Sequence, residues 1–297
     1  MTTLNDIVDE VKLNLAGYTL RQDRFATLTQ PIDTDDLTLP LSSVENFGRG
    51  IVEIDEELMF VDSINRSSSS IIVAPWGRGQ SGTSASSHNA NIRVTAAPTF
   101  PVVSIKKAVN DTIRSVYPML FGVAKTTFTS SSAKTTYALP AEAEGILAVS
   151  YDTVGSSKEW TPVRRWRMDP MAASVEYPTG NSLSIYDPIP SGRTVQVVYT
   201  KVPTALSTGS DVFETVTGLE TASKEVIVLG AAYRLAAFID PARLTFTSPE
   251  ADENDAKRPF GSGANATRFL LALYQQRLNE EAGRLRDKYP IRVHFTV

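Results

Sequence analysis

The sequence contains no cysteine and only two histidines, His88 and His294. The absence of cysteine excludes disulfide bonds, zinc sites built from thiolates and a cysteine nucleophile. Two histidines leave little material for histidine-rich metal sites or for catalysis by a serine and histidine pair. We therefore expect a protein that is not an enzyme and that holds no metal or other cofactor.

Long hydrophobic runs and a strong net charge are also absent. The most apolar stretch, Val226–Tyr233, is far shorter than the roughly 20 residues that a membrane-spanning helix needs, so we expect no membrane contact. The formal net charge is −4, which provides no global positive field to attract nucleic acid. With 297 residues, 42% of them hydrophobic, the chain has material for about two globular domains.

Apolar residues recur at helical spacing in four segments of the chain. These segments predict helices at 2–16, 101–117, 218–238 and 266–288. Thr217 and Glu220 have the separation of a capping box, which predicts the start of the third helix. No single helix can bury its own apolar face, so the simplest arrangement packs all four together.

The segments between these helices favour β-structure. Ile51–Val61 predicts a hairpin with Asp55 and Glu56 near its turn. Ile71–Ala74 and Ile92–Thr95 are further candidate strands, and short strands separated by turn residues continue from 124 to 203. Strands at this spacing are typical of small barrels and sandwiches.

Together these patterns predict an α+β fold in which a four-helix bundle carries two inserted antiparallel β modules, each a small barrel or sandwich. The predicted domains are a bundle made of 1–18, 99–122 and 207–290, a β module at 19–98, a β-sandwich at 123–206 and a C-terminal docking tail at 291–297.

The most specific local pattern lies between two of the candidate strands. Its residues are Arg78, Gly79, Gly82, Thr83, Ala85, His88 and Val94. The segment resembles a motif of β-rich modules in structural proteins of tailed bacteriophages. That motif usually has a glycine three residues after the histidine, where this chain has Asn91. Asparagine is the non-glycine residue that best tolerates a left-handed backbone, so we expect the same turn.

The wider layout resembles the head-to-tail adaptor proteins of tailed bacteriophages over most of the chain. The pieces that carry this resemblance are the N-terminal helix, the motif, Phe100–Asn110, Tyr117–Pro118, Tyr137–Glu142, Gly145–Ser150, Trp160–Val163, Val195–Tyr199 and Gly230–Leu235. The resemblance implies a virion structural protein at the neck, assembled in the host cytoplasm. It implies a ring, with twelve copies expected, between the portal protein and the downstream neck or tail completion protein. Double-stranded DNA would pass through the ring without sequence-specific binding.

The C-terminal residues have the alternating pattern of a strand. They are Ile291, Arg292, Val293, His294, Phe295, Thr296 and Val297. Four apolar side chains share one face, and exposed backbone could add a strand to a neighbouring protein. We therefore expect these residues to bind a partner, with folding back onto the chain's own sheet as the alternative.

Other features admit a chemical interpretation beside a structural one. The loop at Arg78–His88 could cradle a phosphate, but it lacks the lysine of a Walker motif, so we expect a rigid turn. For His88 alone we expect a turn residue. The acidic residues Glu53, Asp55, Glu56 and Glu57 could supply the paired carboxylates of a glycosidase. At a hairpin turn we expect a solvated tip.

Two more groups of charged residues remain open. The segment Glu250–Asp255 could bind Ca²⁺, although a solvated loop is the simpler interpretation. Residues Trp160, Arg164, Arg165, Trp166 and Arg167 could stack on nucleic acid, although we expect a sheet surface or an interface. The alternatives to an adaptor are thus a tail-tip, baseplate or fibre protein, a carbohydrate-active enzyme and a DNA-binding module.

Overall fold

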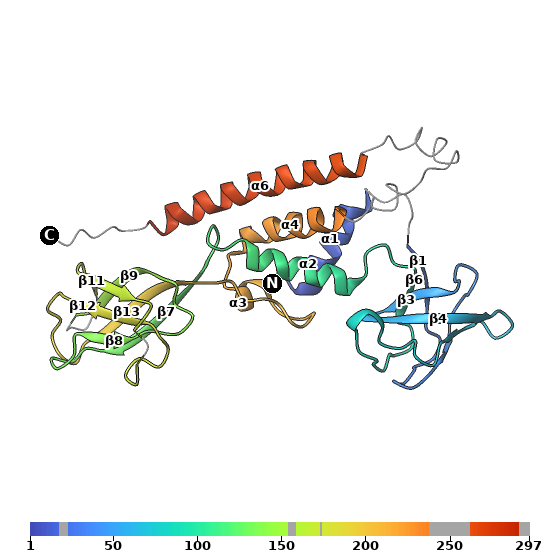
Figure 1. Cartoon of the computed structure of the whole chain (residues 1–297), viewed down its shortest axis with the longest axis horizontal. Coiled ribbons are helices and arrows are strands. Elements are labelled where there is room, and N and C mark those ends of the chain that lie inside the picture. The colour runs from blue at the N-terminus through green and yellow to red at the C-terminus, as the bar shows by residue number, and fades with distance from the viewer. Residues whose placement is uncertain (18–22, 154–158, 173, 238–261, 291–297) are drawn as a thin grey trace. The chain divides into compact units, whose positions relative to one another are not determined.

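The computed structural model describes residues 1–17, 23–153, 159–172, 174–237 and 262–290. Its α-helices are α1 (Leu4–Ala16), α2 (Val102–Ser115), α3 (Phe213–Thr217), α4 (Lys224–Ala236) and α6 (Ser262–Lys288) (Figure 1). Two 3₁₀ helices are η1 (Gln80–Gly82) and η2 (Thr221–Ser223).

The described residues form thirteen β-strands in three antiparallel sheets. The six-stranded sheet has the order β1-β6-β3-β4-β5-β2, with strands at Arg24–Thr27 (β1), Thr38–Pro40 (β2), Gly50–Ile54 (β3), Glu57–Asn65 (β4), Ser70–Val73 (β5) and Arg93–Ala96 (β6). The four-stranded sheet has the order β10-β9-β13-β7, with β7 at Gly122–Thr129, β9 at Gly145–Asp152, β10 at Trp160–Pro162 and β13 at Thr194–Lys201. The three-stranded sheet has the order β11-β12-β8, with β8 at Thr136–Ala138, β11 at Trp166–Asp169 and β12 at Ser182–Ile185.

The predicted fold class, a four-helix bundle with inserted β modules, is wrong. The described residues form thirteen strands in three sheets beside five α-helices, and each β region has a hydrophobic core of its own. Helical periodicity shows which face of a helix is buried but not which element covers it. A prediction from this periodicity therefore gives the helices too large a part in the fold, because the pairing of distant strands leaves no local pattern in the sequence.

Individual helices are confirmed more closely than the class. The described helices α1, α2, α4 and α6 overlap the four predicted segments. The predicted capping box is wrong, because Thr217 ends α3 instead of starting a helix. Its Oγ1 donates to the Phe213 carbonyl at 2.7 Å and accepts from the Leu219 amide at 3.1 Å. Gly218 then takes the left-handed backbone that stops the helix, and α4 begins only at Lys224.

The six-stranded sheet curls until its two outer strands meet. The predicted hairpin is confirmed as β3 and β4, whose two-residue turn is possible because Asp55 adopts φ 53°. An isolated bridge joins Leu28, which follows β1, to Leu41, which follows β2. The inner face holds a core that includes Val52, Met59, Val61, Ile71, Val73 and Val94. This closure gives the sheet an inside that is apolar and a rim where strands begin and end.

The other two sheets share one core, as expected of a sandwich. Val149 from β9, Val195 and Val197 from β13, and Leu183 and Ile185 from β12 all belong to it. Asn181 ties the loop before β9 in place, since its Nδ2 contacts the carbonyl oxygens of Pro140, Ala141 and Ala143 at 3.0–3.3 Å.

The chain divides into two compact units. One contains Met1–Leu4, Asn110–Ile227 and Leu273–Val297, and the other contains Asn5–Val109 and Val228–Ala272. The six-stranded sheet lies in the second of these units, and the sandwich lies in the first. In the described part of the chain, no helix combines the length and the hydropathy needed to cross a membrane.

Gly77 lies in the turn after β5, where an added methyl group has no room. A Cβ atom there would lie 2.5 Å from the Phe60 carbonyl oxygen and 2.8 Å from Val73 Cγ1. We expect Gly77→Ala to destabilise the six-stranded sheet by about 1–3 kcal/mol, because the backbone or the core must shift. Hydrogen exchange of the β4 and β5 amides measures this change.

Gly48→Ala is the matched control. A Cβ atom at Gly48 meets no atom within 4 Å, so this substitution should leave the exchange rates of the sheet unchanged. Equal protection of β4 and β5 in the two variants would contradict the packing described for Gly77.

Candidate functional site

The loop between β5 and β6 carries the phage-type motif and has an unusual backbone. Left-handed residues occur at Gly79 (φ 63°), Ser81 (φ 56°) and Gly82 (φ 82°). Asn91 has φ 66°, the conformation expected from an asparagine in place of glycine. The loop therefore folds back on itself within a few residues, and side chains must hold it there.

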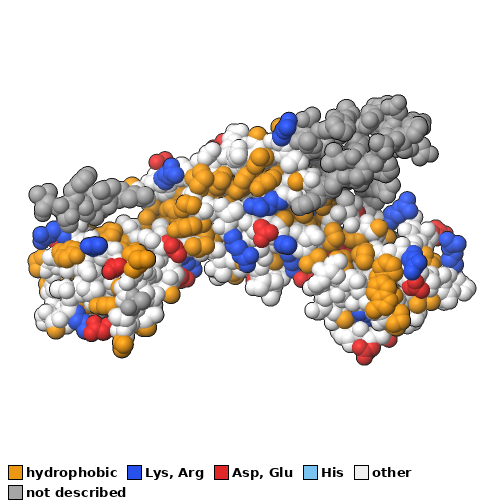
Figure 2. Space-filling model, viewed as in Figure 1, with side chains coloured by type: hydrophobic (Ala, Val, Ile, Leu, Met, Phe, Trp, Pro, Cys, Tyr) orange, Lys and Arg blue, Asp and Glu red, His pale blue; other side chains and the backbone are white. Residues whose placement is uncertain are grey.

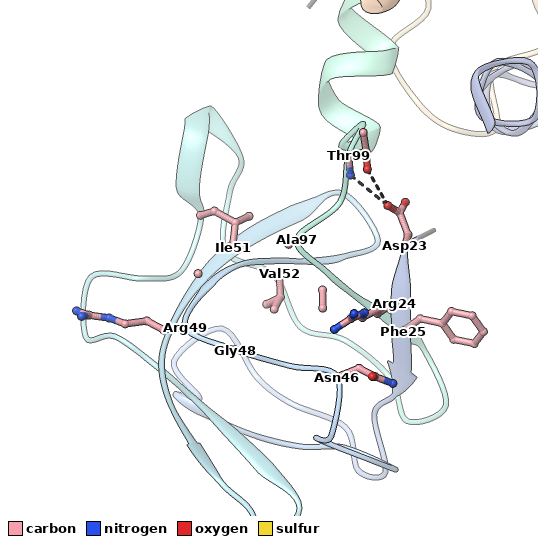
Figure 3. A pocket seen from close by; sticks show the side chains of 12 residues that line it. Asp23, Arg24, Phe25, Asn46, Gly48, Arg49, Ile51, Val52, Ala97 and Thr99 are labelled. Carbon is pink, nitrogen blue, oxygen red and sulfur yellow. Dashed lines mark hydrogen bonds between the residues drawn. The ribbon is translucent and has the colours of Figure 1, made fainter. Parts of the chain in front are cut away.

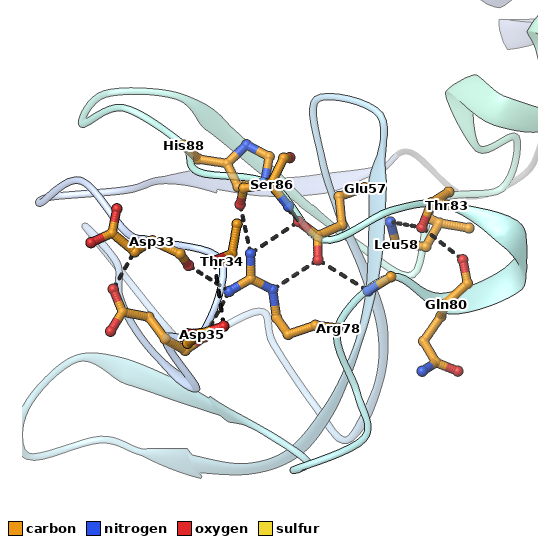
Figure 4. Close-up of polar contacts among 12 residues, drawn as sticks. Asp33, Thr34, Asp35, Glu57, Leu58, Arg78, Gln80, Thr83, Ser86 and His88 are labelled. Carbon is orange, nitrogen blue, oxygen red and sulfur yellow. Dashed lines mark hydrogen bonds and ion pairs between the residues drawn. The ribbon is translucent and has the colours of Figure 1, made fainter.

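Arg78 provides the central contacts of this loop (Figure 4). Its Nε and Nη2 donate to the two oxygens of Glu57 at 2.8 and 3.0 Å. Nη1 donates to the carbonyl oxygens of Asp33 and Asp36, both at 2.8 Å, and Nη2 donates also to that of Ser86 at 2.7 Å. All five N–H groups of the guanidinium are thus used, which is how a buried arginine avoids a desolvation penalty.

Glu57 is the buried anion that faces this cation, and its side chain is 1% exposed. Its carboxylate also accepts from the backbone amides of Gly79 and Ser86, each at 3.0 Å. Burial acts to raise the pKa of Glu57, but hydrogen bonds from Arg78, His88 and Ser86 outweigh burial and lower the pKa to about 2. Glu57 is therefore a fixed charge that fastens both ends of the loop to β4.

His88 completes the cluster between two carboxylates. Its Nδ1 lies 2.8 Å from Asp55 Oδ2, and its Nε2 lies 3.0 Å from Glu57 Oε2. Ionised carboxylates only accept hydrogen bonds, so both contacts are made when both ring nitrogens carry protons. Burial acts to lower the pKa of His88, but the hydrogen bonds to Asp55 and Glu57 outweigh it and raise the pKa above its ordinary value of 6.5.

The remaining motif residues hold the backbone or fill the core. Thr83 Oγ1 donates to the Gln80 carbonyl at 2.7 Å and accepts from the Leu58 amide at 3.1 Å. A Cβ atom at Gly79 would lie 3.0 Å from the Thr83 carbonyl oxygen and 3.1 Å from the Ala85 amide, so glycine is needed for this close approach. Val94 is fully buried in the sheet's core.

The expectation of a solvated acidic tip is wrong for Glu53 and Glu57, which are buried, and holds for Asp55 and Glu56, which are exposed. Glu53 accepts from the Val102 amide at 2.5 Å, at the start of α2, and burial raises its pKa. Glu56 pairs with Lys106 of α2. Each of these carboxylates has a structural partner, so the arrangement is one of fastening and does not resemble the free carboxylate pair of a glycosidase.

Sequence reasoning identified the loop but missed Glu57 as the partner of Arg78. The position of Glu57 on the predicted hairpin could have revealed this role. Alternate side chains of a strand point to the same face, and one face of this hairpin is buried. A buried arginine also requires an anion, and Glu57 stands near it on the preceding hairpin.

The other candidate sites from the sequence lie elsewhere in the chain. The docking tail, 291–297, and the solvated loop expected at 250–255, with Ca²⁺ binding as its alternative, lie outside the described residues, so both stay predictions. Arg165 pairs with Asp187 at 2.7 Å. The structure places Trp160 on β10 and Trp166 on β11, which belong to different sheets. Among the described residues, no group of three or more potential ligands could hold a metal ion.

A family model described as SU10 adaptor protein matches residues 85–294. The chain belongs to the SU10 adaptor protein family. This confirms the resemblance to phage adaptors, and it makes the chain a phage structural adaptor and a virion-associated protein. The match begins inside the motif loop, so most of the six-stranded sheet precedes it. No curated protein matches the chain.

Membership in this family also separates the alternatives. A structural adaptor of a phage is not normally an enzyme, which disfavours the carbohydrate-active alternative. Partners of such an adaptor are other structural proteins of the phage.

The Arg78–Glu57 pair can be tested by a conservative change. Arg78→Lys keeps the charge but cannot reach the carboxylate and three carbonyls at once. We expect it to destabilise the six-stranded sheet by about 1–3 kcal/mol, because lysine cannot replace all five donors and leaves carbonyl oxygens and part of the Glu57 carboxylate without a hydrogen bond. Hydrogen exchange of the β3, β4 and β6 amides measures the loss. The matched control is Arg165→Lys, which changes a more exposed pair and should cost less than about 1 kcal/mol in the sandwich.

His88 predicts a pH dependence with a defined sign. A folded-state pKa above 6.5 means that His88 stabilises the sheet fully below about pH 6.5 and loses this contribution as the pH rises through the raised value. Scanning calorimetry from about pH 6 to 9 should show a falling transition temperature for the sheet, and a shallower fall in His88→Gln. An identical pH slope in the two proteins would contradict the charged state assigned to His88.

Proposed function

We propose that this adaptor forms a closed ring at the head-to-tail junction of a tailed bacteriophage, between the portal protein and the downstream neck or tail completion protein. The observation that carries the proposal is family membership over residues 85–294. A ring follows when one surface of a subunit binds a different surface of the next and the rotation closes. Twelve copies is the number we propose.

The helices offer surfaces that such a ring could bury. On α6, the side chains of Leu270, Tyr274, Leu278, Ala282 and Leu285 form a buried stripe, and much of the remaining surface is exposed. Phe269 on the same helix is 58% exposed, and Leu13 on α1 is 74% exposed. Contact with a neighbouring subunit would remove these two side chains from water, which is favourable for apolar surface. We assign both to the contact between neighbouring subunits.

Charge supports a passive role toward DNA. Stable binding to a duplex needs several Lys or Arg side chains to neutralise phosphates, and this chain has a net charge of −4. We propose that the ring surrounds the DNA channel and lets double-stranded DNA pass without sequence-specific binding.

The C-terminal residues 291–297 are our candidate for contact with the portal. Their alternation of apolar side chains suits strand addition, in which backbone hydrogen bonds hold the segment and one face fills pockets. We propose that this segment binds the portal protein after the ring has closed.

The ring contact can be tested with charge substitutions on exposed positions. Leu13→Glu combined with Phe269→Glu should leave the fold intact but prevent ring closure, because buried unpaired carboxylates oppose association. Light scattering of the protein mixed with its portal measures the loss. Val175→Glu is the control, since Val175 is equally apolar and fully exposed on the sandwich unit. A complete ring in the double variant would contradict the proposed contact.

The docking tail can be tested by deletion. Removing residues 291–297 should leave a folded protein that no longer joins filled heads to tails, since the proposed strand addition is lost. Electron microscopy of particles made with the truncated protein gives the readout. Normal virions would contradict the docking role without affecting the ring.

A further inference from the structure

A groove opens at the rim of the six-stranded sheet (Figure 3). Residues from β1, β3, the end of β6 and the segment before β3 line it. The lining residues include Asp23, Arg24, Phe25, Arg49, Val52 and Ala96. We call this the rim groove. The loop 79–91 fastened by Arg78 does not line it, so the groove is separate from the motif.

The rim groove is built on fixed elements. Val52 belongs to the buried core of the sheet, and Ala96 packs against that core, so the floor is apolar. Phe47 is buried in the same core and anchors the segment before β3. Asp23 is held on the side of the groove opposite Arg49, where its carboxylate accepts hydrogen bonds from the Thr99 amide and hydroxyl, each at 3.2 Å (Figure 3). A preformed groove loses little entropy when a ligand binds.

Cations stand at the edge of the groove. Arg24 is exposed and makes no ion pair or side-chain hydrogen bond with a described residue. Arg49 pairs with Asp62 at 3.2 Å, but both side chains are more than half exposed, so water competes for this pair. Arg93 lies over the ring of Phe25 at 4.1 Å, beside the groove. The groove thus offers one guanidinium, that of Arg24, without a partner among the described residues, and a second, that of Arg49, that can exchange partners.

Trp76 and Phe60 form an aromatic surface, the Trp76 platform, which contacts the groove residue Arg49. Trp76 is 64% exposed and stacks on Phe60 with ring centroids 5.1 Å apart. The Arg49 guanidinium lies over the Phe60 ring at 5.8 Å. Gln80 Nε2 donates to the Trp76 carbonyl at 2.6 Å, and the Gly77 carbonyl accepts from the Phe60 amide at 2.7 Å. Trp76 is therefore held at the surface by a hydrogen bond to its own carbonyl and by one to the carbonyl of the next residue, Gly77. Figure 2 shows hydrophobic side chains beside basic and acidic ones on this sheet.

The chemistry of this surface favours a polypeptide with acidic side chains. Tryptophan and arginine are enriched at protein interfaces, and here both are exposed beside an apolar floor. A nucleic acid strand would instead need a row of cations. Here the carboxylates of Asp23 and Asp62 lie beside Arg24 and Arg49, so a continuous run of phosphates would meet negative as well as positive charges. A polypeptide in which glycine and apolar residues separate the carboxylates can place one carboxylate against Arg24 and keep the others away from Asp23 and Asp62.

We propose that the rim groove and the adjoining Trp76 platform bind an extended acidic segment of another polypeptide. One carboxylate of the segment pairs with Arg24, and an apolar neighbour packs on the groove floor and Trp76. This inference goes beyond the ring and does not depend on it, because a single subunit carries the whole surface.

The probe is a short blocked peptide of repeating glycine, glutamate and leucine, labelled for fluorescence anisotropy and titrated with the full-length chain. Arg24→Glu and, separately, Trp76→Ser should each weaken binding by about tenfold or more. Arg24→Lys should recover part of the affinity. Circular dichroism should show that each variant is folded, as expected for exposed positions.

Arg66→Glu is the matched control, because Arg66 is exposed in the turn between β4 and β5, does not line the groove, and its substitution changes the net charge equally. It should alter affinity by less than about twofold. The proposal is overturned if Arg66→Glu weakens binding as much as Arg24→Glu. It is equally overturned if glutamine in place of glutamate binds as tightly, if an oligothymidylate of equal length binds more tightly, or if no peptide binding occurs at about 1 mM.

Discussion

A buried ion pair, Glu57 with Arg78, is the interaction on which the six-stranded sheet depends. Neither charge is stable in an apolar environment alone, and each is acceptable because every donor of the guanidinium is used and the carboxylate accepts from three sides. The pair connects β4 to the loop before β6 and to the segment after β1. In a chain without disulfide bonds, it performs the fastening that a covalent link often supplies in small β modules.

Much of the local structure followed from the sequence. Apolar residues at helical spacing found four helices, and alternation found the β3–β4 hairpin, because both patterns depend on neighbours within a few residues. The left-handed backbone at Asn91 was equally visible, since few residue types tolerate it.

The fold class and the site partners were not visible in the same way. β1 pairs with β6 although most of the sheet's sequence separates them, and periodicity carries no information about such pairing. Thr217 has the correct spacing for a capping box, yet its hydroxyl bonds backward to Phe213, because Gly218 ends the helix there. Glu57 looked like one acid in a polar turn. Its role depends on Arg78 and His88, which reach it only through the closed sheet.

Different parts of the chain have different roles. The motif fixes the shape of a sheet, the exposed apolar positions on the helices suit contact between subunits, and the family match identifies the whole as an adaptor. The most direct test is an in situ reconstruction of the neck of the virion. We predict density for this chain in a closed ring that contacts the portal and encloses DNA. Density for the chain along the tail tube or at the distal tip, with none beside the portal, would contradict the account.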